Sequence, residues 1–369
     1  MKIAKIEAIP LAAPFTFRAK GHAWRGRDYG ALELLLVRVE TEDGLVGWGE
    51  SFAYNCQAAV RTALQEMIAP IAIGRDARDI AGLLYEIQRV MHLYGRSGVV
   101  NYALSGLDIA LWDIAARRAG VPLCELFGAA SVDSLPAYAS LFRYDDPDSA
   151  AAAAQAAVAE GYGAVKVHTR GVADVVAVRQ ALDAAVPVMM DTNCAWLPGE
   201  AAEYLRQLQG YDIRWVEEPL YPPEDFETLA ELQRRTGQAL AIGENACTAY
   251  DFQKILRAQA ARFVQPSVIK VGGISEFRKV ATLAEVYGAT LAPHSPYYGP
   301  GLLATLHLMA AYPARWGCIE FFMAGVEAFP YGDALVPVNG AFALPRSPGL
   351  GLEPSAAFLR DYRVEPATA

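Results

Sequence analysis

The sequence predicts a parallel β/α barrel of the (β/α)8 type with a smaller second domain. Between residues 164 and 322, short apolar runs each end in a polar residue, and these residues recur at intervals of 23 to 27 positions. A strand of about five residues, a helix of about 10 to 15 and two short loops fill such an interval, so one βα unit is repeated. The chain has 369 residues, more than the roughly 250 of a barrel, and its 53% hydrophobic content permits a large core. The C-terminal ends of barrel strands surround one mouth, where these polar residues should converge.

The N-terminal part predicts a small α+β unit. Strands of a three-stranded antiparallel meander are expected at residues 2–11, 31–44 and 45–51. Hydrophobic and polar residues alternate in the second of these, and a Glu-Asp-Gly turn ends it. The polar stretch 16–30 is expected to be a loop of the lid type, and 51–57 is a second candidate loop. Residues 58–128 predict helices, most clearly over 101–120.

The strands of the predicted barrel end at polar positions. These ends lie near Ser140, His168, Asp191, Glu217, Glu244, Ser267, His294 and Glu320. Beyond residue 325 the chain is rich in Pro and Gly and has no further βα unit. We therefore predict an N-terminal domain over residues 1–128, a barrel over 129–325, and a tail over 326–369 that returns to the N-terminal domain.

Composition and charge disfavour several classes of protein. A formal net charge of −9 without a basic cluster argues against binding to nucleic acid or to an anionic membrane surface. The sequence has no uninterrupted apolar run of about 18 residues, so we expect no membrane span. Met1 is followed directly by a strand pattern, so we expect no signal peptide. Five cysteines without CxxC spacing are expected to be free thiols in a reducing cytoplasm.

Three acidic residues at consecutive strand ends predict a metal site. Asp191, Glu217 and Glu244 should converge, and three carboxylates at close range cannot all stay ionised without a cation between them. Oxygen ligands favour a hard divalent ion, with Mg²⁺ as the first choice. Each carboxylate could instead cap a helix or pair with a base, but three in register favour the metal. Asn193 points to the same side as Asp191 and could hydrogen-bond a substrate.

Basic side chains flank the predicted metal site. Lys166 and His168 are two residues apart on one strand and so face the same way, and His294 stands across the mouth before a Gly-rich loop. Nitrogen bases on opposite sides of a metal suit proton transfer at carbon, where one removes a proton and the other delivers one. Glu320 could hydrogen-bond a bound carboxylate as the neutral acid, or could cap a helix. His22, in the predicted lid loop, is a further candidate for substrate contact.

A set of short segments occurs in a familiar order. These segments are SGLDIALWDIAARRAGVPLCELFG (105–128), AVKVH (164–168), MMDTN (189–193), WVEEP (215–219), IGEN (242–245), VIKVGGISE (268–276) and APHSPYYGPG (292–301). Together they resemble the enolase superfamily, in its branch of mandelate racemase and muconate lactonising enzyme. The resemblance covers essentially the whole chain, and as an ordered set the motifs are highly specific.

The resemblance implies a modified (β/α)7β barrel under an α+β capping domain, which the N-terminal part and the C-terminal tail form together. It implies Mg²⁺ on Asp191, Glu217 and Glu244, and removal of the proton α to a substrate carboxylate. The two candidate loops fall where the family has its specificity loops. The substrate contacts expected from them are His22, Trp24, Arg25 and Tyr54. Related proteins often form dimers or octamers, so a homo-oligomer is expected.

Two positions depart from the family pattern. The second strand usually carries Lys-x-Lys with the second Lys as base, and here His168 takes that place; whether it or Lys166 is the base stays open. The sixth strand usually carries a catalytic Lys, or an Asp that orients the His of the seventh strand, and here Ser267 takes that place. His294 should therefore be a weaker base. Lys270 should face away from the Ser267 side, and we do not count it as the missing Lys.

Four functions are compatible with these residues. The favoured one is a sugar-acid dehydratase, in which a base removes the α-proton and His294 protonates a departing β-hydroxyl to give a 2-keto acid. A cycloisomerase is closely related, because a ring oxygen leaves instead. A racemase or epimerase of a 2-hydroxy or amino acid needs two matched bases, and the loss of the Asp partner of His294 disfavours it. An inactive relative that binds a metal or a carboxylate is the alternative from another class.

Overall fold

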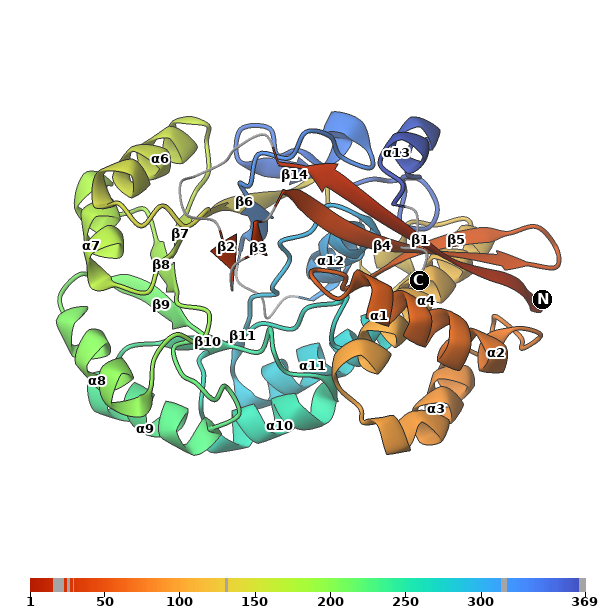
Figure 1. Cartoon of the computed structure of the whole chain (residues 1–369), viewed down its shortest axis with the longest axis horizontal. Coiled ribbons are helices and arrows are strands. Elements are labelled where there is room, and N and C mark those ends of the chain that lie inside the picture. The colour runs from red at the N-terminus through yellow and green to blue at the C-terminus, as the bar shows by residue number, and fades with distance from the viewer. Residues whose placement is uncertain (16–22, 25–26, 29, 130–131, 313–316, 365–369) are drawn as a thin grey trace.

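The computed structural model describes residues 1–15, 23–24, 27–28, 30–129, 132–312 and 317–364, with the backbone alone for 23–24 and 27–28. The molecule has two lobes (Figure 1). One is a curled sheet of parallel strands with helices around it, and the other is an antiparallel sheet with helices packed beside it. These lobes correspond to the predicted barrel and the predicted capping domain.

The barrel contains eight parallel strands within the described residues. They are β6 (Ser134–Leu141), β7 (Val165–His168), β8 (Val188–Asp191), β9 (Ile213–Glu217), β10 (Leu240–Ile242), β11 (Phe263–Val264), β12 (Thr290–Leu291) and β13 (Ile319–Phe322). Their hydrogen-bonded order is β12-β11-β10-β9-β8-β7-β6-β13. At the junction of β12 and β13, the Ser295 N–H donates to Glu320 Oε2 at 2.9 Å and the Ser295 hydroxyl donates to the Glu320 carbonyl at 3.3 Å. These two bonds connect the ends of the strand path.

Helices alternate with the strands along the chain. They are α6 (Pro147–Ala159), α7 (Val172–Ala181), α8 (Pro198–Gln207), α9 (Phe226–Thr236), α10 (Thr248–Ala258), α11 (Gly273–Tyr287) and α12 (Pro300–Ala311). Seven helices between eight strands confirm the (β/α)7β architecture that the resemblance implied.

A packed layer of side chains fills the barrel interior. It consists of Tyr138, Ala164, Met189, Trp215, Ala241, Phe263 and Ala292, with the partly buried Cys318 against it. Side chains two residues apart on a strand share a face. The next layer toward the C-terminal ends therefore contains Ser140, Lys166, Asp191, Glu217, Gly243, Gln265, His294 and Glu320. The apolar layer is the floor of a polar layer, which explains why the polar residues recur in one register.

The capping domain has the predicted antiparallel meander. Its strands are β1 (Ile3–Pro14), β4 (Ala31–Thr41) and β5 (Val46–Ser51), in the order β1-β4-β5. Its helices are α1 (Gln57–Thr62), α2 (Ala69–Ala72), α3 (Ile80–Val90), α4 (Gly98–Ala119) and α5 (Leu123–Leu126). Short turns of π- or 3-10 helix lie at η1 (Ala63–Ile68), η2 (Met91–Tyr94) and η3 (Gly332–Leu335). Within the stretch predicted as a lid loop, β2 (Ala23–Trp24) pairs with β3 (Arg27–Asp28).

Buried carboxylates join the capping domain to the barrel. Asp108, on α4, accepts hydrogen bonds from the backbone N–H of Ser275 at 2.9 Å and from its hydroxyl at 2.5 Å. Glu50, on β5, accepts one from the Gly301 N–H at 2.8 Å. Gly301 lies in the first turn of α12, directly after the loop that begins at His294. Burial raises the pKa of both carboxyl groups to about 7.

The C-terminal tail returns to the N-terminal sheet, as predicted. After the last helix, α13 (Ala356–Asp361), the Tyr362 carbonyl accepts a hydrogen bond from the Ala12 N–H at 2.9 Å. The tail also supplies β14 (Ala341–Ala343), which pairs antiparallel with β6. The tail therefore contacts both lobes.

Helix α4 is long and apolar enough to cross a membrane by length and composition alone. However, 78% of that apolar window is buried inside the protein. Its buried residues pack in the core of the capping domain with those of β4. We therefore interpret α4 as the central helix of the capping domain.

Candidate active site

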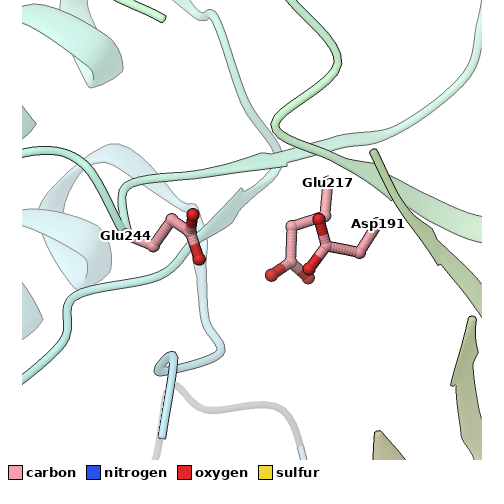
Figure 2. Close-up of side chains that lie close together, drawn as sticks. All are labelled: Asp191, Glu217 and Glu244. Atoms are coloured by element: carbon pink, nitrogen blue, oxygen red, sulfur yellow. The ribbon is translucent and has the colours of Figure 1, made fainter. Parts of the chain in front are cut away.

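The three acidic residues predicted to bind metal converge at the mouth of the barrel. Asp191 ends β8, Glu217 ends β9, and Glu244 lies two residues beyond β10. One oxygen from each lies within 4.8 Å of the others, and Figure 2 shows the side chains pointing toward one another. Asp191 and Glu217 are fully buried. Burial, followed by the negative charge of Asp191, raises the pKa of Glu217 well above its usual value. The donor set is made of hard oxygen atoms, and a divalent cation fits it because the cation allows all three groups to be ionised.

Glu218 fixes the backbone around these carboxylates. Its Oε1 accepts a hydrogen bond from the Gly243 N–H at 2.9 Å, and its carbonyl accepts bonds from the Thr192 hydroxyl and the Cys194 N–H, both at 2.7 Å. Glu218 has φ 40°, and Gly243, directly before Glu244, has φ 132°. A Cβ at Gly243 would lie 2.7 Å from the Phe252 ring. Glu218 and Gly243 thus position the segments that carry the three carboxylates relative to one another.

Lys166 is held as an ammonium between acidic groups. Its Nζ lies 2.8 Å from Glu217 Oε1, 2.8 Å from Glu320 Oε1 and 3.2 Å from Asp191 Oδ2. Burial alone would lower the pKa of Lys166, but the charges of Glu217 and Glu320 raise it well above its usual value. A lysine in this position stabilises negative charge and has no lone pair for proton removal.

His168 presents one ring nitrogen to the site. Its Nδ1 lies 2.7 Å from the carbonyl oxygen of Leu141. A carbonyl oxygen only accepts hydrogen bonds, so Nδ1 carries a proton. Nε2 lies 3.1 Å from Asp191 Oδ2. Nε2 is therefore the nitrogen that faces the carboxylate cluster.

His294 contacts the cluster from the other side. Its Nε2 lies 2.9 Å from Glu244 Oε2. Burial would raise the pKa of Glu244, but His294 holds it at about 2. Within the described parts of the chain, His294 Nδ1 is buried and has no hydrogen-bond partner. This matches the expectation that Ser267, at the family's Asp position, does not orient the ring.

Glu320 differs from its predicted protonation state. The Lys166 ammonium lies 2.8 Å from Oε1, and Oε2 accepts the Ser295 N–H. Burial would raise the pKa of Glu320, but Lys166 and then His294 hold it below its usual value. The structure therefore favours a carboxylate over the neutral acid. The helix-cap alternative does not fit either, because Ser295 precedes the first residue of α12, Pro300.

The predicted substrate contacts are only partly described. Asn193 lies at the site, where its N–H donates to Asp191 Oδ1 at 3.0 Å. Tyr54 is 38% exposed on the loop after β5, and its ring centroid lies 6.5 Å from that of Phe52. His22 and Arg25 lie outside the described residues, and of Trp24 only the backbone in β2 is described.

Three residues of the mouth were not predicted as site residues. Ser140, Gln265 and Arg143 each have at least one buried side-chain N or O atom without a hydrogen-bond partner among the described residues. Ser140 and Gln265 belong to the polar layer, and the two-residue offset from Tyr138 and Phe263 could have identified them. Arg143 lies two residues beyond β6, and no pattern in the sequence marks it.

Comparison with known proteins identifies the family. Residues 148–358 match the family described as "Enolase C-terminal domain-like", and residues 28–128 match "Mandelate racemase / muconate lactonizing enzyme, N-terminal domain". The chain belongs to this family of the enolase superfamily. The resemblance seen in the sequence is therefore confirmed. As a member of the superfamily, the chain is a Mg²⁺-dependent enzyme with a small-molecule substrate.

Relatives in this family support the assignment over nearly the full chain. A 3,6-anhydro-alpha-L-galactonate cycloisomerase from Streptomyces coelicolor is 32% identical over 87% of this chain and 88% of its own. An arabinonate dehydratase from Saccharolobus solfataricus is 28% identical over 93% of this chain and 94% of its own. The crystal structure of a mandelate racemase/muconate lactonizing protein from Paracoccus denitrificans complexed with magnesium aligns with a TM-score of 0.87, at 28% identity and 99% coverage of both chains.

Proposed function

We propose that this enolase superfamily enzyme dehydrates a sugar acid to a 2-keto acid. The observation that carries the proposal is the arrangement of two imidazoles. His168 contacts Asp191 and His294 contacts Glu244, so the rings approach the carboxylate cluster from different strands. Elimination needs one group to accept the α-proton and another to protonate the leaving hydroxyl, and two imidazoles suit both tasks near neutral pH. Relatives named as sugar-acid dehydratases support the substrate class.

Asp191, Glu217 and Glu244 are the proposed ligands of Mg²⁺, which neutralises charge that builds on the substrate carboxylate. Lys166 holds an ammonium beside the same position, anchored by Glu217 and Glu320 at 2.8 Å each. A fixed positive charge in a buried site stabilises developing negative charge without reorganisation. Lys166 is thus assigned to charge stabilisation.

We assign the role of base to His168 rather than to Lys166. Its Nδ1 proton is directed at the Leu141 carbonyl, so Nε2 is the nitrogen available to take the α-proton. His294 is the proposed acid. It protonates the β-hydroxyl as the C–O bond breaks, water leaves, and the resulting enol tautomerises to the keto acid. The sugar acid is converted to the 2-keto acid and water, so the reaction needs no oxidant, reductant or other reactant.

Cycloisomerisation is the closest alternative, because a ring oxygen can leave in place of the hydroxyl. The cycloisomerase from Streptomyces coelicolor favours it. Racemisation requires two bases of matched strength. Among the described residues, no carboxylate or other partner bonds His294 Nδ1, and this argues against a matched pair. An inactive relative would bind Mg²⁺ and turn over no acid.

Incubation of the enzyme with Mg²⁺ and a library of sugar acids and their lactones in D₂O, followed by NMR, tests the proposal. A 2-keto product with deuterium at C3 supports dehydration. Conversion of a lactone to an isomeric acid supports cycloisomerisation instead. Deuterium at the α-carbon of otherwise unchanged acid indicates a racemase or epimerase, and the absence of any turnover favours the inactive relative.

Assembly and compartment are further parts of the proposal. We propose a homo-oligomer, a dimer or an octamer, in the cytoplasm. The five cysteines are all free in the structure, and this supports a reducing compartment. Light scattering coupled to size-exclusion chromatography measures the assembly, and a monomeric mass would contradict it.

A further inference from the structure

Arg143 is a partly buried cation that the proposed chemistry does not use. It lies two residues beyond the end of β6. Its Nη2 donates a hydrogen bond to Asn193 Oδ1 at 3.1 Å, and the Asn193 N–H donates to Asp191 Oδ1 at 3.0 Å. The guanidinium is therefore two hydrogen bonds away from a proposed Mg²⁺ ligand.

The guanidinium has an unused donor. Nε of Arg143 is buried and makes no hydrogen bond to any residue that the structure describes. Nε and Nη2 lie on the same edge of the planar guanidinium, and this edge binds a carboxylate through two parallel N–H···O bonds. Nη2 has a second hydrogen beyond the one given to Asn193. The Nε–H on this edge can therefore still bind an anion.

The local charge also favours an anion. Over the described part of the chain, no carboxylate forms an ion pair with Arg143, although Asp145 and Asp191 are near enough to attract it. Arg170, two residues after His168, adds a second positive charge. Burial, and then the charge of Arg170, lowers the pKa of Arg143. A desolvated guanidinium beside a like charge is stabilised when an anion arrives.

An aromatic wall places Arg143 on the His168 side of the mouth. Phe142 stacks on Phe322 with centroids 5.6 Å apart and planes at 22°, and the His168 ring contacts the same Phe322 edge-on at 5.9 Å. Phe142 directly precedes Arg143 in the chain, so these apolar rings lie next to a partly buried guanidinium. Electrostatic attraction is stronger where burial reduces the contact with water.

We propose that Arg143 binds the second, distal carboxylate of the substrate, so that the preferred substrate is a sugar diacid rather than a sugar monoacid. One carboxylate then lies at the Asp191, Glu217 and Glu244 cluster, with its α-carbon beside His168. The other end of the chain meets the Nε and Nη2 edge of Arg143. This inference rests on the proposed function and names its substrate class. Asn193 keeps the guanidinium in place.

Isothermal titration calorimetry with Mg²⁺ tests the inference on paired probes. The panel contains six-carbon sugar diacids and the corresponding monoacids, beginning with galactarate and galactonate. The variants are Arg143→Gln and Arg143→Lys, with Arg206→Gln as a matched control, because Arg206 lies on the surface of α8 and pairs with Glu203. Binding is measured on His294→Ala versions of each protein, so that slow turnover does not distort the heats.

We expect Arg143→Gln to weaken diacid binding by at least about 30-fold, because it removes one partner of a buried charge pair. Monoacid binding should change by less than about threefold, Arg143→Lys should keep part of the preference, and Arg206→Gln should match the parent. Equal losses for diacid and monoacid would overturn the inference, since they indicate a structural role. So would unchanged diacid binding, or no diacid binding to the parent protein. A dehydratase that prefers monoacids would refute the inference and leave the proposed function standing.

Discussion

Replacing Trp215 by phenylalanine should weaken Mg²⁺ binding about tenfold while leaving the fold intact. The indole Nε1–H donates to Glu217 Oε2 at 3.1 Å inside the barrel. The other carboxylate oxygen, Oε1, is held by Lys166. Trp215 therefore fixes the rotation of a carboxylate that we propose as a metal ligand.

The size of the effect follows from these two contacts. A hydrogen bond to a charged group contributes about 1.5–3 kcal/mol, which corresponds to about 10- to 160-fold in a binding constant. The lower end applies here, because Lys166 still anchors Oε1 when the indole is gone. Phenylalanine keeps the aromatic packing against Phe263, whose ring centroid lies 4.8 Å from that of Trp215.

Calorimetric titration of Mg²⁺ into wild type and Trp215→Phe measures the change. Trp112→Phe is the matched control, since it removes an indole N–H bond to Ser275 Oγ of 2.9 Å at the interface between capping domain and barrel. The melting temperature of each protein checks the fold. Unchanged Mg²⁺ affinity in Trp215→Phe, or an equal loss in Trp112→Phe, would refute the positioning role of Trp215.

Two further predictions concern the metal site and the pH dependence of stability. Asp191→Asn, Glu217→Gln and Glu244→Gln should each abolish both Mg²⁺ binding and turnover, as measured by calorimetry and by product formation; activity retained in all three would remove the metal assignment. His307 is buried, its Nε2 faces the Leu350 carbonyl at 3.2 Å, and burial lowers its pKa to about 4. As the pH falls from about 6.5 toward 4, the unfolded chain takes up this proton before the folded one, so stability is lost in that window, by about 2 kcal/mol between pH 7 and pH 5. Urea unfolding at both pH values should show this extra loss in wild type relative to His307→Gln, and equal losses would contradict it.

The regular positions of the strand ends were enough to predict most of the site from the sequence. Asp191, Glu217 and His294 follow the packed residues Met189, Trp215 and Ala292 by two positions, and this offset forces them to the same layer. A repeat of similar length therefore identifies the mouth of a barrel without coordinates. Glu244 is offset by one more residue, and the positive φ of Gly243 returns its side chain to the cluster.

Side-chain contacts between different strands could not be predicted from the sequence. The ionised state of Glu320 depends on a 2.8 Å distance to Lys166, and no spacing along the chain encodes that distance. The role of Lys166 could not be predicted either, because the sequence pattern also allows this lysine to be the base. Arg143 was missed because it lies past the end of β6, outside the periodic positions. Its role depends on its neighbour Asn193, 50 residues away.

In the proposed reaction two imidazoles divide the proton transfers, with His168 as base and His294 as acid. Proton NMR of His294→Ala with Mg²⁺ and the substrate in D₂O tests it most directly. We predict that this variant loses formation of the 2-keto product by at least about 100-fold and still exchanges the α-proton for deuterium, whereas His168→Gln loses both. Full dehydration by His294→Ala, or α-exchange that survives in His168→Gln, would contradict the account.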